Sequence, residues 1–287
     1  VALKLLLPDA TGPTAQRFSR EAELTAKLEH PNIVPVHEFG QLPDPEGKPS
    51  LFLSMKRIRG RNLKQLLRDL AARDPAATQA YSRVRLLVIF QEICRAIAFA
   101  HSRGVLHRDL KPSNIMIGDF GETLLVDWGL AKRIGEPEER IRRAGAPRVA
   151  GAGEDLTALT LQGDVIGTPA YMSPEQARGE LDGLDVRTDV YSLGAILYEM
   201  LTFRPPLAGA DVNEVLELAR SGAVPPPSSV PGVARIPPEL EAVCLRAMAF
   251  RREDRYPSAR DLLDDVQLFL DGVKERERRQ AEAAERL

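Results

Sequence analysis

The most informative stretch of the chain is His107-Arg108-Asp109-Leu110-Lys111-Pro112-Ser113-Asn114. It puts a carboxylate, an ammonium and an amide on one short turn between two apolar anchors, Leu106 and Ile115. A single loop carboxylate is usually only solvated. Three polar groups at fixed spacing between two anchors can be aimed at one point, and this arrangement is typical of a catalytic loop.

The two sides of this stretch have different apolar patterns. Upstream, the spacing predicts strands at 1–7, 33–39 and 51–58, a helix at 17–29 and a Pro- and Gly-containing loop at 41–50. Downstream, a helix begins after the capping residue Asn62 and helical periods then dominate. The predicted elements of this second part are helices at 63–72, 81–103, around 173, 190–202, 212–220, 238–249 and 258–270, and short strands at 115–117 and 124–126.

These patterns predict an α+β chain with a small β-rich lobe at 1–58, a larger helical lobe at 59–270 and a charged helical tail or linker at 271–287. With 44% hydrophobic and 28% charged residues, the composition fits a globular chain with a core. The formal net charge of −2 gives no reason to expect a nucleic-acid partner.

Membrane and disulfide signals are weak. The longest apolar stretch, 193–203, is interrupted by Glu199 and is well short of the ~20 residues that a membrane-spanning helix needs. The two cysteines, Cys94 and Cys244, have no metal or disulfide spacing. We expect both to be buried small hydrophobes, which fits a reducing cytoplasm.

The stretch at 107–114 resembles the catalytic loop of the eukaryotic-type Ser/Thr protein kinases, and within them the bacterial branch. The resemblance covers Val1 to about Leu270 and implies a two-lobed protein-kinase-like fold that uses ATP to phosphorylate Ser and Thr hydroxyls of protein substrates. Asp109 would then orient the hydroxyl and accept its proton, Lys111 would reach the γ-phosphate, and Asn114 would hold one Mg²⁺. His107 would pack in the interior and support the loop.

Two strings compete for the family's Asp-Phe-Gly metal motif. Asp-Phe-Gly itself stands at 119–121, but it begins only five residues after Asn114, which leaves no room for two strands and a turn. We expect 118–122 to be the turn itself. Asp127, which begins Asp-Trp-Gly thirteen residues after Asn114, is the expected ligand of Mg²⁺ or, alternatively, Mn²⁺. Trp128 would fill the apolar place of the usual Phe.

The resemblance places most ATP contacts in the first lobe. Lys4 would pair with the α- and β-phosphates, and Glu21 would hold its flexible ammonium in place. The residues implied around the adenine are the ring contacts Ala2 and Met116, the gatekeeper Met55, and the hinge residues Lys56, Arg57 and Ile58. The family's Gly-rich loop should precede Val1, so we expect this chain to be a fragment whose activity is impaired without that loop.

The string Gly-Thr-Pro-Ala-Tyr-Met-Ser-Pro-Glu at 167–175 resembles the end of the family's activation segment. Thr168 would hydrogen-bond Asp109 and Lys111, as in Ser/Thr kinases. Glu175 is expected to form a buried pair with Arg255. Asp189 is expected to accept backbone N–H groups of the catalytic loop.

Regulation is predicted in the Arg-, Glu- and Gly-rich stretch at 133–164. Thr157 and Thr160 are candidate autophosphorylation sites, with Thr160 preferred, although a solvated Thr is about as well supported for either. Arg108 would bind the resulting phosphate. The arginines between 140 and 148 fit a solvated charge run better than a docking patch, because acidic residues lie beside them.

Two other functions compete with that of a protein kinase. A small-molecule phosphotransferase of the same fold would lack the segment at 168–175. A pseudokinase or signalling scaffold would bind nucleotide without efficient catalysis, but the five polar residues central to catalysis are all present: Lys4, Glu21, Asp109, Asn114 and Asp127. Expected partners are protein substrates, a second copy during autophosphorylation, and a membrane or sensor domain beyond residue 287.

Overall fold

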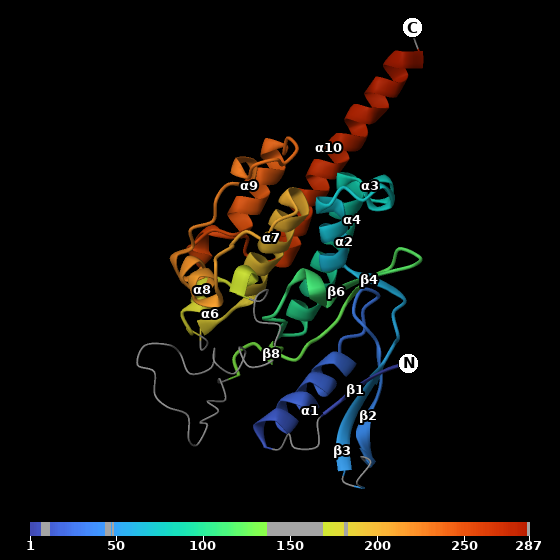
Figure 1. Ribbon diagram of the computed structural model, residues 1–287, viewed down its shortest axis with the longest axis vertical. Coiled ribbons are helices and arrows are strands. Elements are labelled where there is room, and N and C mark those ends of the chain that lie inside the picture. Colours follow the sequence, from blue (N-terminus) through green and yellow to red (C-terminus); the bar gives the residue numbers. More distant parts are fainter. Residues whose placement is uncertain (7–11, 44–46, 48, 137–168, 181–182, 286–287) are drawn as a thin grey trace.

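The computed structural model describes residues 1–6, 12–43, 47, 49–136, 169–180 and 183–285. Strands and a single helix form a small lobe at one end of the molecule, and a larger bundle of helices forms the rest (Figure 1). The predicted α+β, two-lobed architecture is confirmed. Within the described residues, no helix combines the length and the apolar character that a membrane crossing requires.

The small lobe is an antiparallel sheet with one helix packed on it. Its strands are β1 (Ala2–Leu5), β3 (Pro49–Met55) and β2 (Val36–Pro43), in the order β1-β3-β2. Helix α1 (Pro13–Ala26) contributes Phe18 and Ala22, which are one turn apart and pack on Leu53 of the central strand.

Several predicted boundaries in this lobe are wrong, including those of the strands at 33–39 and 51–58, which the structure places at Val36–Pro43 and Pro49–Met55. Helix α1 begins four residues before the predicted start, because Pro13 is well suited to a first helical turn, and it ends at Ala26 instead of 29. The predicted loop at 41–50 is shorter, since Pro43 and Pro49 still pair across the hairpin. The mostly exposed edge strand β2 tolerates polar and Pro residues that read as loop in the sequence.

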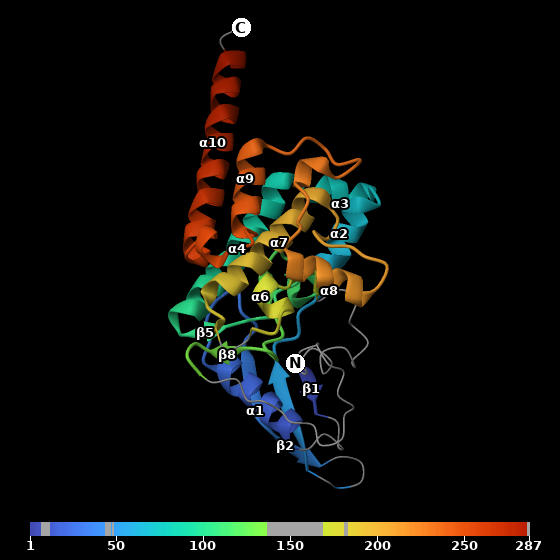
Figure 2. The ribbon, with the colours of Figure 1, turned by 90° about the vertical axis from the view of Figure 1, so that its left-hand side faces the viewer.

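The helical lobe is built around three long helices, α4 (Arg83–Ser102), α7 (Val186–Thr202) and α10 (Ala259–Glu285). Shorter helices surround them: α2 (Leu63–Ala71), α3 (Pro75–Ala80), α6 (Pro174–Ala177), α8 (Val212–Ser221) and α9 (Pro238–Ala247). The predicted cap of α2 is confirmed as a capping box between Asn62 and Gln65. The predicted tail is helical, and α10 continues beyond the body of the lobe to Glu285 (Figures 1 and 2).

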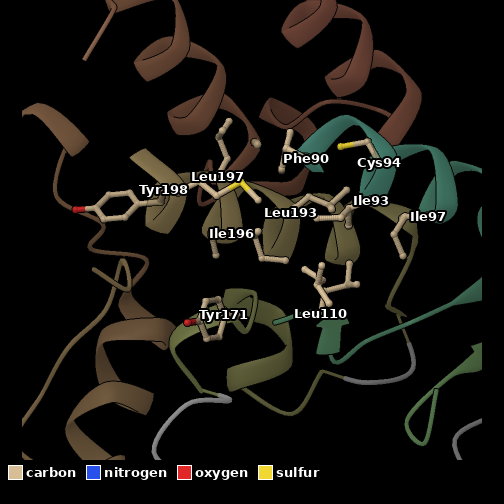
Figure 3. Close-up of a cluster of buried hydrophobic side chains, with 14 of the residues drawn as sticks. Phe90, Ile93, Cys94, Ile97, Leu110, Tyr171, Leu193, Ile196, Leu197 and Tyr198 are labelled. Atoms are coloured by element: carbon tan, nitrogen blue, oxygen red, sulfur yellow. The ribbon is translucent and has the colours of Figure 1, made fainter. Parts of the chain in front are cut away.

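The main core lies where α4 crosses α7. Apolar side chains of α4, including Phe90 and Ile93, meet Leu193 and Leu197 of α7, and Leu110 of the catalytic loop packs with them (Figure 3). Both cysteines are free and buried, as predicted. Because Leu110 directly follows Asp109, the core fixes the backbone of the polar turn.

Two small sheets connect the lobes to the catalytic loop. One has the order β4 (Gly60–Asn62), β6 (Ile115–Gly118) and β7 (Thr123–Leu125). The other pairs β5 (Val105–Leu106) with β8 (Lys132–Arg133). The loop therefore leaves one sheet at Leu106 and enters the other at Ile115, so its two ends are held by different ladders.

Candidate active site

The three polar groups of the catalytic loop meet at the carboxyl group of Asp109. Lys111 Nζ lies 3.0 Å from Asp109 Oδ2. Asn114, at the end of a 3₁₀ turn (Pro112–Asn114), donates its Nδ2 to the backbone oxygen of Asp109 at 2.9 Å and to Oδ2 at 3.3 Å. Burial raises the pKa of Asp109 above its ordinary value of 3.8, and the neighbouring Lys111 ammonium opposes the shift.

Asp189 holds the backbone of the catalytic loop through hydrogen bonds, as predicted. Its Oδ2 accepts the backbone N–H of His107 and its Oδ1 accepts that of Arg108, both at 2.8 Å. His101 Nε2 lies 2.8 Å from the same Oδ2. These contacts hold Arg108 at φ +66°, a left-handed conformation that costs energy for a residue with a side chain.

His107 has a structural position. It is fully buried, its ring lies 4.6 Å from that of Trp128, and its Nδ1 accepts the Asp109 N–H at 3.3 Å. Burial lowers its pKa, so the ring is neutral and supports the loop by packing. Trp128 is itself 1% exposed, so the larger aromatic ring is accommodated within the core.

A second polar cluster joins the two lobes. Lys4 Nζ lies 2.7 and 2.9 Å from the two carboxylate oxygens of Glu21 and 3.1 Å from Asp127 Oδ1. Burial alone lowers the pKa of Lys4, but Asp127 and Glu21 outweigh it and leave that pKa raised. Glu21, on α1, has a pKa raised by burial and only partly restored by Lys4. Burial acts to raise the pKa of Asp127, but the Lys4 ammonium outweighs burial and the pKa is lowered.

The backbone at 127–129 lets the Asp127 and Glu21 side chains lie close to Gly129. Asp127 has φ +62°, again a conformation rarely adopted by a residue with a side chain. A Cβ atom on Gly129 would lie 3.2 Å from Asp127 Oδ1 and 3.3 Å from Glu21 Oε2. Glycine at this position therefore leaves room for the two carboxylates beside Lys4.

The competing string at 119–121 is a turn, as predicted. Gly118 donates its N–H to the Glu122 oxygen at 2.8 Å, and Gly121 donates to the Gly118 oxygen at 2.9 Å. Phe120, at the tip of this turn, is 98% exposed. Within the part of the chain that the structure describes, Asp119 contacts the Arg59 oxygen and forms no ion pair with Lys4 or Lys111.

The adenine-binding residues implied by the resemblance lie on neighbouring strands. Ala2 of β1 pairs directly with Met55 of β3, and Met116 lies on β6. Of the hinge residues, Lys56 uses its backbone N–H to bind the Pro35 oxygen at 3.0 Å. Of its two backbone hydrogen-bonding groups, Lys56 therefore has only the carbonyl left for a ligand. Arg57 and Ile58 follow it outside any strand.

The segment after residue 168 is fixed by a buried ion pair. Glu175 binds Arg255 through two hydrogen bonds, as predicted. Burial acts upward on the pKa of Glu175, but Arg255 prevails and lowers it. Thr168, Thr157, Thr160 and the arginines between 140 and 148 lie outside the described residues.

Two supporting residues were missed from the sequence. Gln176 Nε2 donates to the Arg108 oxygen at 2.8 Å and so ties the segment after residue 168 to the catalytic loop. His101 contacts Asp189 across the lobe. The spacing of Ser173 and Gln176 is that of a capping box, a signal that could have identified Gln176 as ordered. No local signal points to His101.

The family profile described as "Protein kinase domain" matches residues 1–266. The chain belongs to the protein kinase family. It is 36% identical over 265 residues to "Serine/threonine-protein kinase PknD" of Protochlamydia amoebophila, which covers 91% of this chain and 26% of the relative. The PknD of Chlamydia pneumoniae is 35% identical over 279 residues, 95% of this chain and 28% of the relative.

A mycobacterial relative is similar to the same degree. "Serine/threonine-protein kinase PknB" of Mycobacterium tuberculosis is 34% identical over 269 residues, 93% of this chain and 38% of the relative. This kinase chain thus spans between about a quarter and two fifths of the length of these curated relatives. Protein kinases use ATP and a divalent metal ion, and they act on proteins.

Proposed function

We propose that this kinase domain transfers the γ-phosphate of ATP to Ser and Thr hydroxyls of protein substrates. The observation that carries the proposal is the contact of Lys4 with both Glu21 and Asp127, because Asp127 is 123 positions from Lys4 and on the other lobe. A phosphate-binding ammonium and a metal-binding carboxylate thereby face one space. The names of the similar proteins support Ser and Thr as acceptors.

The roles of the catalytic-loop residues follow from their chemistry. Asp109, with its raised pKa and its hydrogen bond to Asn114, accepts the proton of the substrate hydroxyl and orients its oxygen. Lys111, 3.0 Å from Asp109, neutralises negative charge on the transferred phosphoryl group. Thr168, implied by the family resemblance as a partner of Asp109 and Lys111, would complete this set.

The residues that would hold the nucleotide lie around the hinge. Lys4 binds the α- and β-phosphates while Glu21 keeps its ammonium in place. Ala2, Met116 and Met55 would contact the adenine ring. Lys56, through its carbonyl, and the backbone groups of Arg57 and Ile58 hydrogen-bond the ring edge.

The residues present fit a divalent metal ion. The Nδ2 atom of Asn114 is occupied by Asp109, which leaves the amide oxygen of Asn114 for coordination, and the Asp127 side chain is 45% exposed. Both groups are oxygen ligands, which Mg²⁺ prefers, and Mn²⁺ accepts the same set. The ion would supply charge neutralisation between the phosphates. Asn114 and Asp127 would hold it in place.

Regulation and organisation are part of the same proposal. Thr157 or Thr160, preferably Thr160, is autophosphorylated, with a second copy as partner, and Arg108 binds the phosphate. Residues 1–58 and 59–270 act as two lobes, and 271–287 lead toward a membrane or sensor domain in a longer protein. The free cysteines Cys94 and Cys244 support a cytoplasmic location for the domain.

The test is phosphoamino acid analysis after incubation with radiolabelled ATP, Mg²⁺ and a general acceptor protein such as casein. Phosphoserine or phosphothreonine is expected, and it should be absent with Asp109→Asn. Retained Mg-ATP binding without any transfer, in the chain extended upstream through a Gly-rich loop, would favour the nucleotide-binding scaffold instead.

A further inference from the structure

The turn between β6 and β7 presents an aromatic side chain to solvent. Among the described residues, no large apolar side chain is more exposed than Phe120, at 98%. In Figure 1 this turn extends from the helical lobe beside β4. The mechanism proposed above uses no residue of the turn, so the exposure of Phe120 is unexplained by catalysis.

The turn is held firmly in place by its neighbours. Asp119 donates its N–H to the Arg59 oxygen at 3.0 Å, and Gly60 pairs with Gly118. A Cβ on Gly121 would lie 3.2 Å from an Arg85 guanidinium nitrogen at the start of α4. Phe120 is therefore presented from a fixed position between the hinge and α4, at little entropic cost to a ligand.

Further apolar side chains are exposed at the start of α4, next to Arg85, whose guanidinium lies beside the turn. Val84 is 38% and Val88 is 42% exposed, and they lie one turn apart on the same face of the helix. The ring of Tyr81, just before α4, contacts two guanidinium groups, with Arg61 at 5.3 Å and Arg85 at 5.1 Å from its centre. Aromatic, aliphatic and cationic side chains are thus all present at the start of α4.

This side of the hinge also has an excess of positive charge. Lys56, Arg57 and Arg59 are exposed, and none of them has an ion-pair partner among the residues that the structure describes. Arg61 is paired with Asp69 at 2.7 Å. The chain as a whole has a formal net charge of −2, so this basic surface differs from the average surface.

We propose that this surface is a docking site for an acidic segment of a protein substrate that carries one large apolar side chain. We define the hinge–turn surface by its members: Arg59, Tyr81, Val84, Arg85, Val88 and Phe120. The unpaired guanidinium of Arg59 and that of Arg85 bind carboxylates, and Phe120 with the two valines receives the apolar side chain. The substrate role rests on the proposed function; the binding itself does not.

Charge favours a peptide over a nucleic acid at this site. The carboxylates of Asp119 and Glu122 belong to the same turn and would repel a continuous phosphate backbone. A peptide can place its carboxylates at Arg59 and Arg85 and its apolar side chain at Phe120. A substrate docked here is tethered to the kinase, which raises the effective concentration of its hydroxyl near Asp109.

The direct test is fluorescence anisotropy of a labelled peptide with Glu and Asp on both sides of one Leu. The reference peptide replaces every acid by its amide. We expect the acidic peptide to bind the chain, and Phe120→Ser and Arg59→Glu each to weaken it by about tenfold or more. Leu42→Ser is the matched control, because Leu42 is 43% exposed near the end of β2 in the small lobe, where no member of this surface lies.

Four results would overturn the proposal: no binding of the acidic peptide, equal binding of the amide peptide, binding that persists in Phe120→Ser, or tighter binding of a single-stranded oligonucleotide. A dimer in solution that Phe120→Ser dissociates would instead assign the surface to a second copy. Thermal unfolding of each variant checks that the fold is intact.

A second measurement separates this proposal from the proposed function. Phosphorylation is compared for a short Ser-containing peptide with and without the acidic segment attached. Phe120→Ser should lower kcat/KM about tenfold for the attached form only. Loss of transfer to both peptides with normal peptide binding would count against the kinase activity, whereas equal kcat/KM for both peptides would count against docking.

Discussion

Arg255 and Glu175, 80 positions apart, form a buried ion pair with parallel hydrogen bonds of 2.7 and 2.9 Å. The side chains are 0% and 4% exposed. Arg255 also donates to the backbone oxygens of Ala249 and Phe250. The pair therefore joins the segment after residue 168 to the C-terminal part of the helical lobe.

Removing one partner should be strongly destabilising. Arg255→Ala leaves the Glu175 carboxylate buried without its cation, and we expect a loss of ~3–5 kcal/mol in the free energy of unfolding. Urea unfolding monitored by the emission of the only tryptophan, Trp128, measures it. Arg260→Ala is the control: that guanidinium pairs with Asp264 in solvent, and about 0.5 kcal/mol is expected. Similar losses in both variants would contradict this account.

The choice between the two Asp motifs is directly testable. Asp127→Asn should lower phosphate transfer by about 100-fold or more, because it weakens both the proposed metal site and the contact with Lys4. Asp119→Asn, in the exposed turn, should stay within about twofold of the parent activity. Transfer rates at several Mg²⁺ concentrations distinguish them, and a larger defect in Asp119→Asn would reverse the assignment.

Glu21 should matter through the position of Lys4. Glu21→Gln removes the carboxylate that accepts two contacts from the ammonium, and we expect kcat/KM to fall about tenfold or more. Glu23→Gln serves as the control, because Glu23 lies on the same helix but pairs with Lys27 in solvent. Equal activity of the two variants would show that Lys4 is held by other means.

The pH dependence of transfer should report on Asp109. Its pKa is raised by burial, so the ionised base is lost as the pH falls through a value above 3.8, and activity falls with it. Lys111 opposes that shift. Lys111→Met should therefore lower kcat and move the acid limb to higher pH. If the acid limb of the pH profile lies at the same pH in Lys111→Met and in the control Lys27→Met, Lys111 does not lower the pKa of Asp109.

Local signals in the sequence predicted the helices and turns better than the long-range contacts that hold them together. Apolar spacing predicted the long helices, and the short interval after Asn114 correctly identified 118–122 as a turn. The capping pattern at Asn62 was confirmed. These features depend on residues close in sequence, for which propensity and turn chemistry are informative.

Contacts between distant residues were predicted only where the family resemblance supplied them. Asp189 and the Glu175–Arg255 pair are of this kind. The contact of His101 with Asp189 and that of Gln176 with the Arg108 oxygen span 88 and 68 positions and depend on how α4, α6 and α7 pack. The boundaries of α1 and of the β2–β3 hairpin differ from the prediction because of Pro13 and of strand pairing, neither of which the apolar pattern records.

The most direct test of the central claim is transfer of radiolabelled phosphate from ATP/Mg²⁺ to Ser and Thr by this parent chain and by Asp109→Asn, each tested alone and with a Gly-rich loop added upstream. We predict phosphoserine or phosphothreonine in the parent and a loss of about 10²–10⁴-fold in Asp109→Asn, with unchanged nucleotide binding. Equal transfer by the two proteins would contradict the role of Asp109. Absence of transfer in every form, with nucleotide still bound, would contradict the assignment as an active kinase.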